Sequence, residues 1–237
     1  MELFNSPLFS EASLKAYYRF TGNSLDETAN NHDGTDVNAT YGIAYGKYGQ
    51  GVTAPTGNIY ITEHADFEPT TNFSLGGWFK TGAAGGSFFH NSFRDAGGQQ
   101  EGWKCYASTN FAIQIGTTGA QDSNITNPAY AITSTSDAVV NTQLWVHGVA
   151  TYDGSNIRLY INGKLDKTTA CTLAPTYYAG SIVRIGAETY QPATNHILAI
   201  FDGSIDDVFF FNGKVLNAIE VAQIYQDAGG AFLLHFC

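Results

Sequence analysis

The stretch LWVHGVATYDGSNIRLYINGK, residues 144–164, is typical of two consecutive β-strands. Leu144–Tyr152 and Ile157–Ile161 are rich in branched and aromatic side chains, and the polar residues between them indicate a turn. Asn162-Gly163 follows at once, and this pair accepts the positive φ angles of a type I′ turn. The stretch therefore predicts a strand, a turn, a second strand and a tight hairpin.

Runs of the same kind recur along the chain, each bounded by turn residues. They are Leu14–Phe20, Asn58–Thr62, Phe73–Lys80, Trp103–Ala107, Phe111–Ile115, Ile182–Gly186 and Ser204–Phe211. Such a series predicts an all-β fold, either a sandwich or a barrel.

One short helix is predicted near the C-terminus. Asn217 and Glu220 have the spacing of a capping box. An apolar stripe follows at helical spacing, and two glycines end it. The stripe and its stop are Val221, Ile224, Tyr225 and Ala228, then Gly229 and Gly230.

The composition supports one large sandwich. The 237 residues include 26 Gly, 14 Tyr and 16 Phe, and only 14% are charged, below the roughly 25% of ordinary domains. No linker or fixed repeat interrupts the sequence. We therefore predict a single domain over residues 1–237, with residues 1–12 as an N-terminal extension and residues 229–237 as a C-terminal tail.

The charge balance excludes some partners. The formal net charge is −10, and no cluster of Lys or Arg offsets it, so nucleic acid is not an expected partner. No apolar run approaches the ~18 residues of a membrane helix, so membrane insertion is not expected. The N-terminal sequence MELFNSPLFSEASLK lacks the basic and apolar regions of a secretory signal.

The cysteines permit at most one internal disulfide. There are three, Cys105, Cys171 and Cys237, so one thiol is free or pairs with another chain. We favour reduced thiols in the core or in the tail.

Four segments, in order, resemble the laminin-G-like jelly-roll family, within the concanavalin A-like lectin/glucanase superfamily. They are LKAYYRFTGNSLDETANNHDGT (14–35), GKYGQGVTAPTGNIYIT with FSLGGWFKT (46–62 and 73–81), LWVHGVATYDGSNIRLYINGK (144–164) and GSIDDVFFFNGKVLNAIEVAQIY (203–225). The resemblance spans nearly the whole chain. It implies an all-β, two-sheet antiparallel jelly-roll sandwich, and it leaves the function to be argued from a site.

Two departures from the family pattern concern loops. Ala29-Asn30-Asn31 replaces a Gly-Asn-Gly sequence, and Asn31 tolerates the left-handed conformation of that turn. Residues 53–57, TAPTG, replace the usual Phe-Asp-Gly, so a local hairpin is not expected there.

The resemblance also implies a calcium site that joins the first loop to the last strand. Carried over residue by residue, its ligands are Asp26, Asn30, Asp206 and a backbone carbonyl near His32. Calcium prefers such carboxylate, amide and carbonyl oxygens. Asp207 follows Asp206, and adjacent strand residues point to opposite faces, so one of the two is expected to face solvent.

The same residues also have a purely structural interpretation. In it, Asp26 caps a turn, Asn30 and Asn31 form Asx-turns, and Asp206 binds backbone amides.

Polar and aromatic residues offer a candidate glycan site at one end of the sandwich. They are Trp103, Tyr106, Tyr130, Tyr190, Gln191, Asn195 and His196. The alternative is that these aromatic residues only pack the sheets, which their β-propensity favours.

A catalytic function is not expected. Glycosidases need two carboxylates roughly 5–9 Å apart, and the nearest sequence is Glu63-His64-Ala65-Asp66-Phe67-Glu68. On a strand, Glu63 would face away from both Asp66 and Glu68, so an acidic loop is the better interpretation. No serine-hydrolase elbow, zinc spacing or phosphate loop is present.

Three functions remain, and the first is favoured. The first is a non-catalytic carbohydrate- or surface-binding module stabilised by calcium, with a glycan or a cell-surface protein as partner. The second is a structural protein of a virion surface, such as a phage decoration protein, assembled as a homo-oligomer or on a particle. The third, a glycoside hydrolase, lacks its carboxylate pair. The first two imply an extracellular or virion-surface location.

Overall fold

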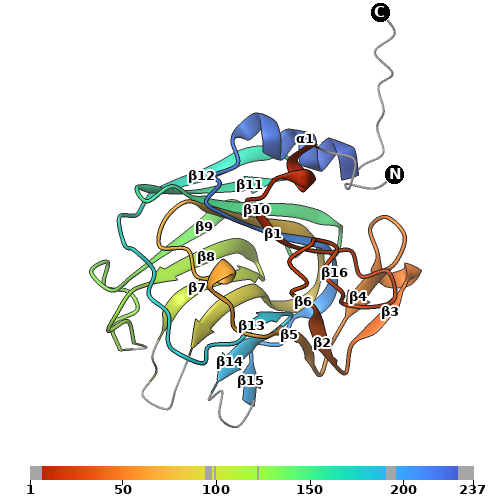
Figure 1. The fold of residues 1–237 in the computed structure, drawn as a ribbon, viewed down its shortest axis with the longest axis horizontal. Helices are drawn as coiled ribbons and strands as arrows, with labels where there is room; N and C mark the ends of the chain where they lie inside the picture. Colours follow the sequence, from red (N-terminus) through yellow and green to blue (C-terminus); the bar gives the residue numbers. More distant parts are fainter. Residues whose placement is uncertain (1–6, 94–97, 99, 122, 191–195, 229–237) are drawn as a thin grey trace, which may run out of the picture.

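The computed structural model describes residues 7–93, 98, 100–121, 123–190 and 196–228, which form two antiparallel sheets packed face to face (Figure 1). Sheet A contains, in spatial order, β12 (Lys164–Ala170), β11 (Asn156–Ile161), β10 (Val146–Tyr152), β6 (Phe73–Phe93), β16 (Asp202–Asn212) and β1 (Leu14–Tyr18). A short strand, β4 (Gly51–Thr53), also pairs with β16, and β3 (Thr40–Gly42) pairs with β4. Sheet B contains β9 (Ala131–Val139), β8 (Asn110–Gly116), β7 (Glu101–Ala107), β6, β13 (Val183–Ile185), β5 (Asn58–Ile61) and β2 (Gly34–Val37). The predicted all-β sandwich is confirmed.

Strand β6 belongs to both sheets because it bends in the middle. Its first half pairs with β10 and β16, and its second half pairs with β7 and β13. The bend falls at Gly85 and Gly86, whose φ angles are 64° and 152°. A Cβ atom on Gly85 would lie 2.3 Å from the carbonyl oxygen of Ala107. The bend therefore requires glycine, both for the positive φ and for the close approach.

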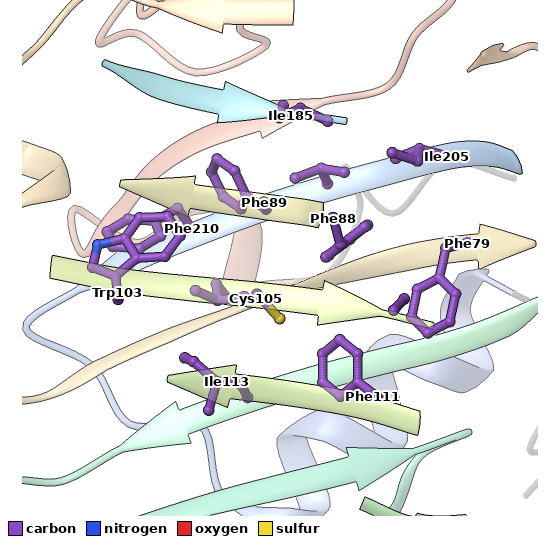
Figure 2. Packing of buried hydrophobic residues seen from close by; sticks show 14 of the residues in the cluster. Phe79, Phe88, Phe89, Trp103, Cys105, Phe111, Ile113, Ile185, Ile205 and Phe210 are labelled. Carbon is purple, nitrogen blue, oxygen red and sulfur yellow. The ribbon is translucent and has the colours of Figure 1, made fainter. Parts of the chain in front are cut away.

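The core between the sheets is built from aromatic side chains of both layers. Trp103 of β7 stacks on Phe210 of β16, with ring centroids 5.0 Å apart, and Phe89 of β6 meets Trp103 edge to face. Figure 2 shows these rings with Cys105 and Ile113, all directed into the same interior. The core fixes which residues of each strand point outward, because side chains alternate along a strand.

A second apolar cluster covers the outer face of sheet A, beneath helix α1 (Ala218–Ala228) (Figure 1). Val221 and Ile224 pack from the helix, as its predicted stripe requires. Leu8 and Phe9 join the same cluster from the 3-10 turn η2 (Pro7–Ser10), within the segment predicted as an extension.

The predicted capping box is confirmed. The side chain of Asn217 accepts hydrogen bonds from the backbone N–H groups of Ile219 and Glu220, and Glu220 accepts one from the N–H of Asn217. Gly229 and Gly230 lie outside the described residues. Asn162 and Gly163 have φ angles of 49° and 79°, which confirms the predicted hairpin turn between β11 and β12.

Each predicted strand run overlaps a strand, but several strands were not predicted. The unpredicted ones are β2, β3, β4, β9, β12, β14 (Glu188–Tyr190) and β15 (His196–Leu198). Residues 54–57 carry the chain from β4 in sheet A to β5 in sheet B, so no hairpin forms there, as expected. The 3-10 turns η3 (Ile43–Tyr45) and η4 (Ala65–Phe67) complete the described elements.

Cys105 and Cys171 are buried free thiols, and Cys237 lies outside the described residues. No helix in the described part of the chain has the length and apolar character needed to cross a membrane.

Candidate functional site

A single row of polar residues crosses the outer face of sheet B, and each strand of this sheet contributes one of them. The strand register pairs them in the order Thr35, Tyr60, Arg184, His90, Lys104, Gln114 and Thr133. We call this set the outer row. Its members lie between inward-pointing residues of the core, such as Trp103 and Cys105 on either side of Lys104. Paired residues of neighbouring strands share a face, so the outer row is one continuous polar stripe.

The centre of the outer row is buried. The β14–β15 ribbon, made of β14 and β15, lies on the side of the sandwich opposite α1 (Figure 1). Arg184, His90 and Lys104 are at most 1% exposed. Buried charges are costly unless they are paired, so their partners define the site.

Arg184 is held by neutral groups around its guanidinium. It donates to Thr189 Oγ1 over 2.8 Å and to Asn58 Oδ1, and its guanidinium carbon lies 5.7 Å from the centroid of the Tyr60 ring. Burial lowers the pKa of Arg184 to about 10.

His90 links the outer row to the β14–β15 ribbon. Its Nε2 atom accepts the backbone N–H of Thr189 over 2.9 Å, and its Nδ1 atom lies 3.2 Å from Ser87 Oγ. Burial lowers the pKa of His90 well below its ordinary value, and the charges of Lys104 and Arg184 lower it further. His90 is therefore neutral, with Nδ1 protonated to donate to Ser87.

Lys104 forms a buried ion pair with Glu188 of β14. Nζ of Lys104 lies 2.6 Å from Oε1 of Glu188, and Lys104 also donates to the side-chain oxygen of Gln100. The hydroxyl of Tyr106 donates to Oε2 of Glu188 over 3.4 Å. Glu188 thus ties the ribbon to two residues of β7.

The outer row opens toward β8 and β9. Gln114 donates to Thr133 Oγ1 over 3.1 Å, and Thr133 and Thr135 are exposed. A depression of about 400 Å³ lies beside them. Its lining residues are Gln114, Ile125, Thr126, Pro128, Ala131, Ile132 and Thr133. Amide and hydroxyl groups beside apolar surface are a combination that suits a polar organic ligand.

The predicted glycan residues divide between three places. Tyr106 lies half-buried beside the outer row, and Tyr130 is half-exposed in the loop after β8. Tyr190 and His196 pair across the β14–β15 ribbon. Gln191 and Asn195 lie outside the described residues.

Trp103 requires a correction. It is fully buried in the core, and its indole N–H donates to the carbonyl of Phe67. It points inward because Lys104, the next residue, occupies the outer face, so Trp103 presents no ring to a ligand.

Asp26, a predicted calcium ligand, has both carboxylate oxygens engaged by donors. Oδ1 accepts the backbone N–H groups of Tyr17 and Thr28, and Oδ2 accepts the Thr28 hydroxyl and the N–H of His32. These bonds tie the first loop to β1.

Asn30 and His32 join the same hydrogen-bonded loop. The side-chain amide of Asn30 donates to the carbonyls of Leu14 and Lys15, and the carbonyl of His32 accepts the hydroxyl of Tyr18. Asn31 has a φ of 57°, as its predicted left-handed turn requires.

Asp206 holds a different loop. Its Oδ2 atom accepts the N–H groups of Lys47 and Tyr48, and its Oδ1 atom accepts that of Asp207. The four predicted ligands thus take part in two hydrogen-bonded groups, one in the first loop and one at the start of β16. Calcium stays a prediction from the resemblance.

The prediction that one of the two adjacent aspartates faces solvent is wrong. Asp206 and Asp207 are 1% and 9% exposed. Asp207 has a φ of 50°, and the register of β16 shifts after Asp206, so the strand alternation is interrupted. Asp207 accepts the hydroxyl of Tyr17 over 2.6 Å. Burial, with the neighbouring charge of Asp207, raises the pKa of Asp206 to about 8, and burial raises that of Asp207 to about 6.

The acidic segment 63–68 forms a loop around η4, which agrees with its interpretation as an acidic loop. The argument from strand alternation does not apply there. Burial raises the pKa of Glu68, and the neighbouring carboxylate of Glu63 raises it further.

None of the seven outer-row residues was predicted from the sequence as a site residue. The available signal was a charged or polar residue between two apolar residues of a short strand, as for Arg184 between Val183 and Ile185. That pattern marks an outward position but does not show that the strands align these positions in one row.

The fold and the outer row define a jelly-roll domain with a polar face beneath a β-ribbon. Residues 51–222 match the family described as the concanavalin A-like lectin/glucanases superfamily, and the chain belongs to this family. No curated protein matches the sequence significantly.

Solved structures share the fold at low sequence identity. The binding domain of Paraclostridial Mosquitocidal Protein 1 superposes with a TM-score of 0.66 and 13% identity, over 91% of this chain and 52% of that domain, so the chain spans about half of its length. Domain 4 of AbnA, a GH43 extracellular arabinanase from Geobacillus stearothermophilus, was solved in complex with arabinotriose. It superposes with a TM-score of 0.65 and 17% identity, over 92% of this chain and 100% of that domain. The CBM40 of Ruminococcus gnavus IT-sialidase, bound to alpha2,3 sialyllactose, superposes with a TM-score of 0.56 and 16% identity, over 68% of this chain and 86% of that domain.

Proposed function

We propose that this chain is a non-catalytic carbohydrate-binding module that binds a glycan at the open end of the outer row. The observation that carries the proposal is the alignment of one polar residue from every strand of sheet B into a single stripe. A core does not require such a stripe. Two neighbours of the same fold were solved with bound sugars, which supports this class of ligand.

The open end has the chemistry that sugars need. Gln114 offers an amide, Thr133 offers a hydroxyl, and Tyr106 lies two residues along β7 from Lys104, on the same face of the sheet. Sugar hydroxyl groups are hydrogen-bond donors and acceptors, and their C–H faces pack on aromatic rings. The buried ion pair beneath them keeps the β14–β15 ribbon in place, so the polar groups are pre-organised.

The glycan is to be found by screening the full chain on an array of neutral and acidic glycans. The best ligand is then titrated calorimetrically against Gln114→Ala and Tyr106→Ala. We expect each variant to weaken binding about tenfold, equivalent to about 1.4 kcal/mol.

Ile219→Ala is a matched control because Ile219 is 80% exposed on α1, on the other side of the sandwich. It should bind like the wild type. Absence of binding to any glycan, or unchanged affinity in both outer-row variants, would contradict the proposal.

The non-catalytic part of the proposal rests on the carboxylates near the outer row. Glu188 forms an ion pair with Lys104, and Glu63 and Glu68 lie on either side of η4 in a loop rather than on a strand. Release of reducing sugar from a polysaccharide that the chain binds would contradict it. Assembly on a virion and calcium stabilisation stay predictions of the sequence analysis.

A further inference from the structure

Two histidines and an aspartate that are distant in the sequence meet beside η4. Nε2 of His32 lies 2.8 Å from Oδ2 of Asp66, and Nδ1 of His64 lies 3.2 Å from the same oxygen. The potential ligand atoms of all three lie within 4.8 Å of one another, and the imidazole centroids are 4.5 Å apart. None of these residues belongs to the outer row.

The backbone holds His32 firmly. Its N–H donates to Asp26 and its carbonyl accepts the hydroxyl of Tyr18, so both polar groups of the peptide are fixed. The imidazole packs against Phe67, with ring centroids 5.1 Å apart, and its side chain is only 9% exposed.

The segment that carries His64 and Asp66 is fixed as firmly. Phe67 is fully buried, and its carbonyl accepts the indole N–H of Trp103 and the side-chain amide of Asn91. Asn212 of β16 donates to the carbonyl of Asp66. Three potential ligands therefore stand on backbone that the core positions, which is what a metal site needs.

We propose that His32, His64 and Asp66 bind a borderline divalent cation, with Zn²⁺ as the reference ion. A tetrahedral zinc centre has bonds of roughly 2.0–2.1 Å, so its ligand atoms lie roughly 3.3 Å apart. The separations of 2.8 and 3.2 Å from Asp66 are within a few tenths of an ångström of this value. The ligand atoms of the two histidines lie within 4.8 Å of each other, and the half-exposed side chain of His64 has room to turn toward the ion. Two imidazoles with one carboxylate favour zinc, nickel or copper over calcium, which binds all-oxygen sites.

The carboxylate of Asp66 is suited to this role. The Nζ atom of Lys15 lies 3.4 Å from Oδ1 of Asp66, on the other carboxylate oxygen. Oδ2 therefore faces both imidazoles, while Oδ1 faces the lysine.

Zinc has to displace two contacts to bind. Nδ1 of His64 accepts the N–H of Asp66, and Nε2 of His32 gives up its contact with Asp66 to become a ligand. An imidazole nitrogen must be deprotonated to bind a metal ion, so zinc competes with protons for these two rings. With three protein ligands, the fourth position goes to water or to another ligand.

The test is calorimetric titration of the chelator-treated full chain with ZnCl₂ at neutral pH. We expect saturable binding of one ion per chain. His64→Ala and Asp66→Asn should each weaken it at least tenfold. The His64 side chain is 53% exposed, so its removal should leave the fold intact, which circular dichroism checks.

Asp137→Asn is the matched control, because it removes an exposed carboxylate that pairs with Lys167 on the surface. It should bind zinc like the wild type. Replacing zinc by Co²⁺ adds a second readout, since tetrahedral cobalt gives visible absorption bands that His64→Ala should abolish.

Two results would overturn the proposal. The first is the absence of saturable zinc binding to the folded wild type. The second is one-to-one binding with equal affinity in His64→Ala, which would place the ion on other histidines of the chain.

Discussion

Nζ of Lys104 and Oε1 of Glu188 lie 2.6 Å apart, with both side chains almost fully enclosed between sheet B and the β14–β15 ribbon. Removing one partner leaves a buried charge without compensation, which costs about 3–5 kcal/mol. We expect Lys104→Met or Glu188→Gln alone to lower the free energy of unfolding by that amount, measured by urea denaturation.

The double variant separates the ion pair from simple packing. Lys104→Met with Glu188→Met removes both charges and keeps similar volumes, so it should be less destabilising than Lys104→Met alone. Additive losses would contradict the assignment of a coupled buried pair.

The two adjacent aspartates of β16 predict a pH dependence of stability. Burial raises the pKa of Asp206 to about 8 and that of Asp207 to about 6, above their ordinary value of 3.8. Between the ordinary pKa of 3.8 and the raised pKa values, the folded chain binds more protons than the unfolded chain. The contribution of the two aspartates to stability therefore falls as the pH rises from about 4 to about 8.

Asp207→Asn is the variant that tests this dependence. It keeps the shape of the side chain but cannot ionise, so part of the stability loss between pH 5 and pH 8 should disappear. Urea unfolding at several pH values measures the difference. Equal slopes for wild type and variant would show that the pair ionises without cost to the fold.

The fold was predictable because its signals are local. The two strands that precede Asn162-Gly163, the turn at this pair and the helix capped by Asn217 are set by neighbouring residues, and all of them are confirmed. Exposed, polar strands such as β12 and β9 were missed because their sequences, KLDKTTA and AITSTSDAV, carry few apolar residues.

The site was less predictable because it depends on register. Arg184 and Lys104 come from distant strands, and only the pairing of β13, β6 and β7 brings them into one row. His32 and His64 show no metal spacing in the sequence, and they meet because η4 carries the second beside the first loop. Asp207 does not follow the alternation of side chains along a strand, because its backbone is in the left-handed conformation.

Asp26 is predicted to be essential to the first loop. Its carboxylate accepts four hydrogen bonds from Tyr17, Thr28 and His32. Asp26→Ala leaves those donors without partners, and we expect a loss of about 2–4 kcal/mol in the free energy of unfolding.

Asp26→Ala also tests whether calcium binds the first loop. The family resemblance implies that calcium binds the folded chain, and a ligand of the folded state raises the melting temperature. We therefore expect the wild type to melt at a higher temperature in calcium than in EDTA, and we expect Asp26→Ala and Asp206→Ala to remove this rise. Equal wild-type melting temperatures in calcium and in EDTA would contradict the calcium site.

Gly85 provides the strictest test of the bend that lets β6 serve both sheets. Gly85→Ala places a Cβ atom 2.3 Å from the carbonyl oxygen of Ala107 at a φ of 64°. Gly180→Ala is the matched control, because its φ is 85° and a Cβ there meets no atom within 4 Å. The control should lose about 1–2 kcal/mol through backbone strain alone. Gly85→Ala should lose about 1–3 kcal/mol more, because the overlap forces β6 and β7 apart. Equal losses in urea unfolding would show that the bend tolerates a side chain, and that β6 crosses between the sheets for a reason other than the close approach of β7.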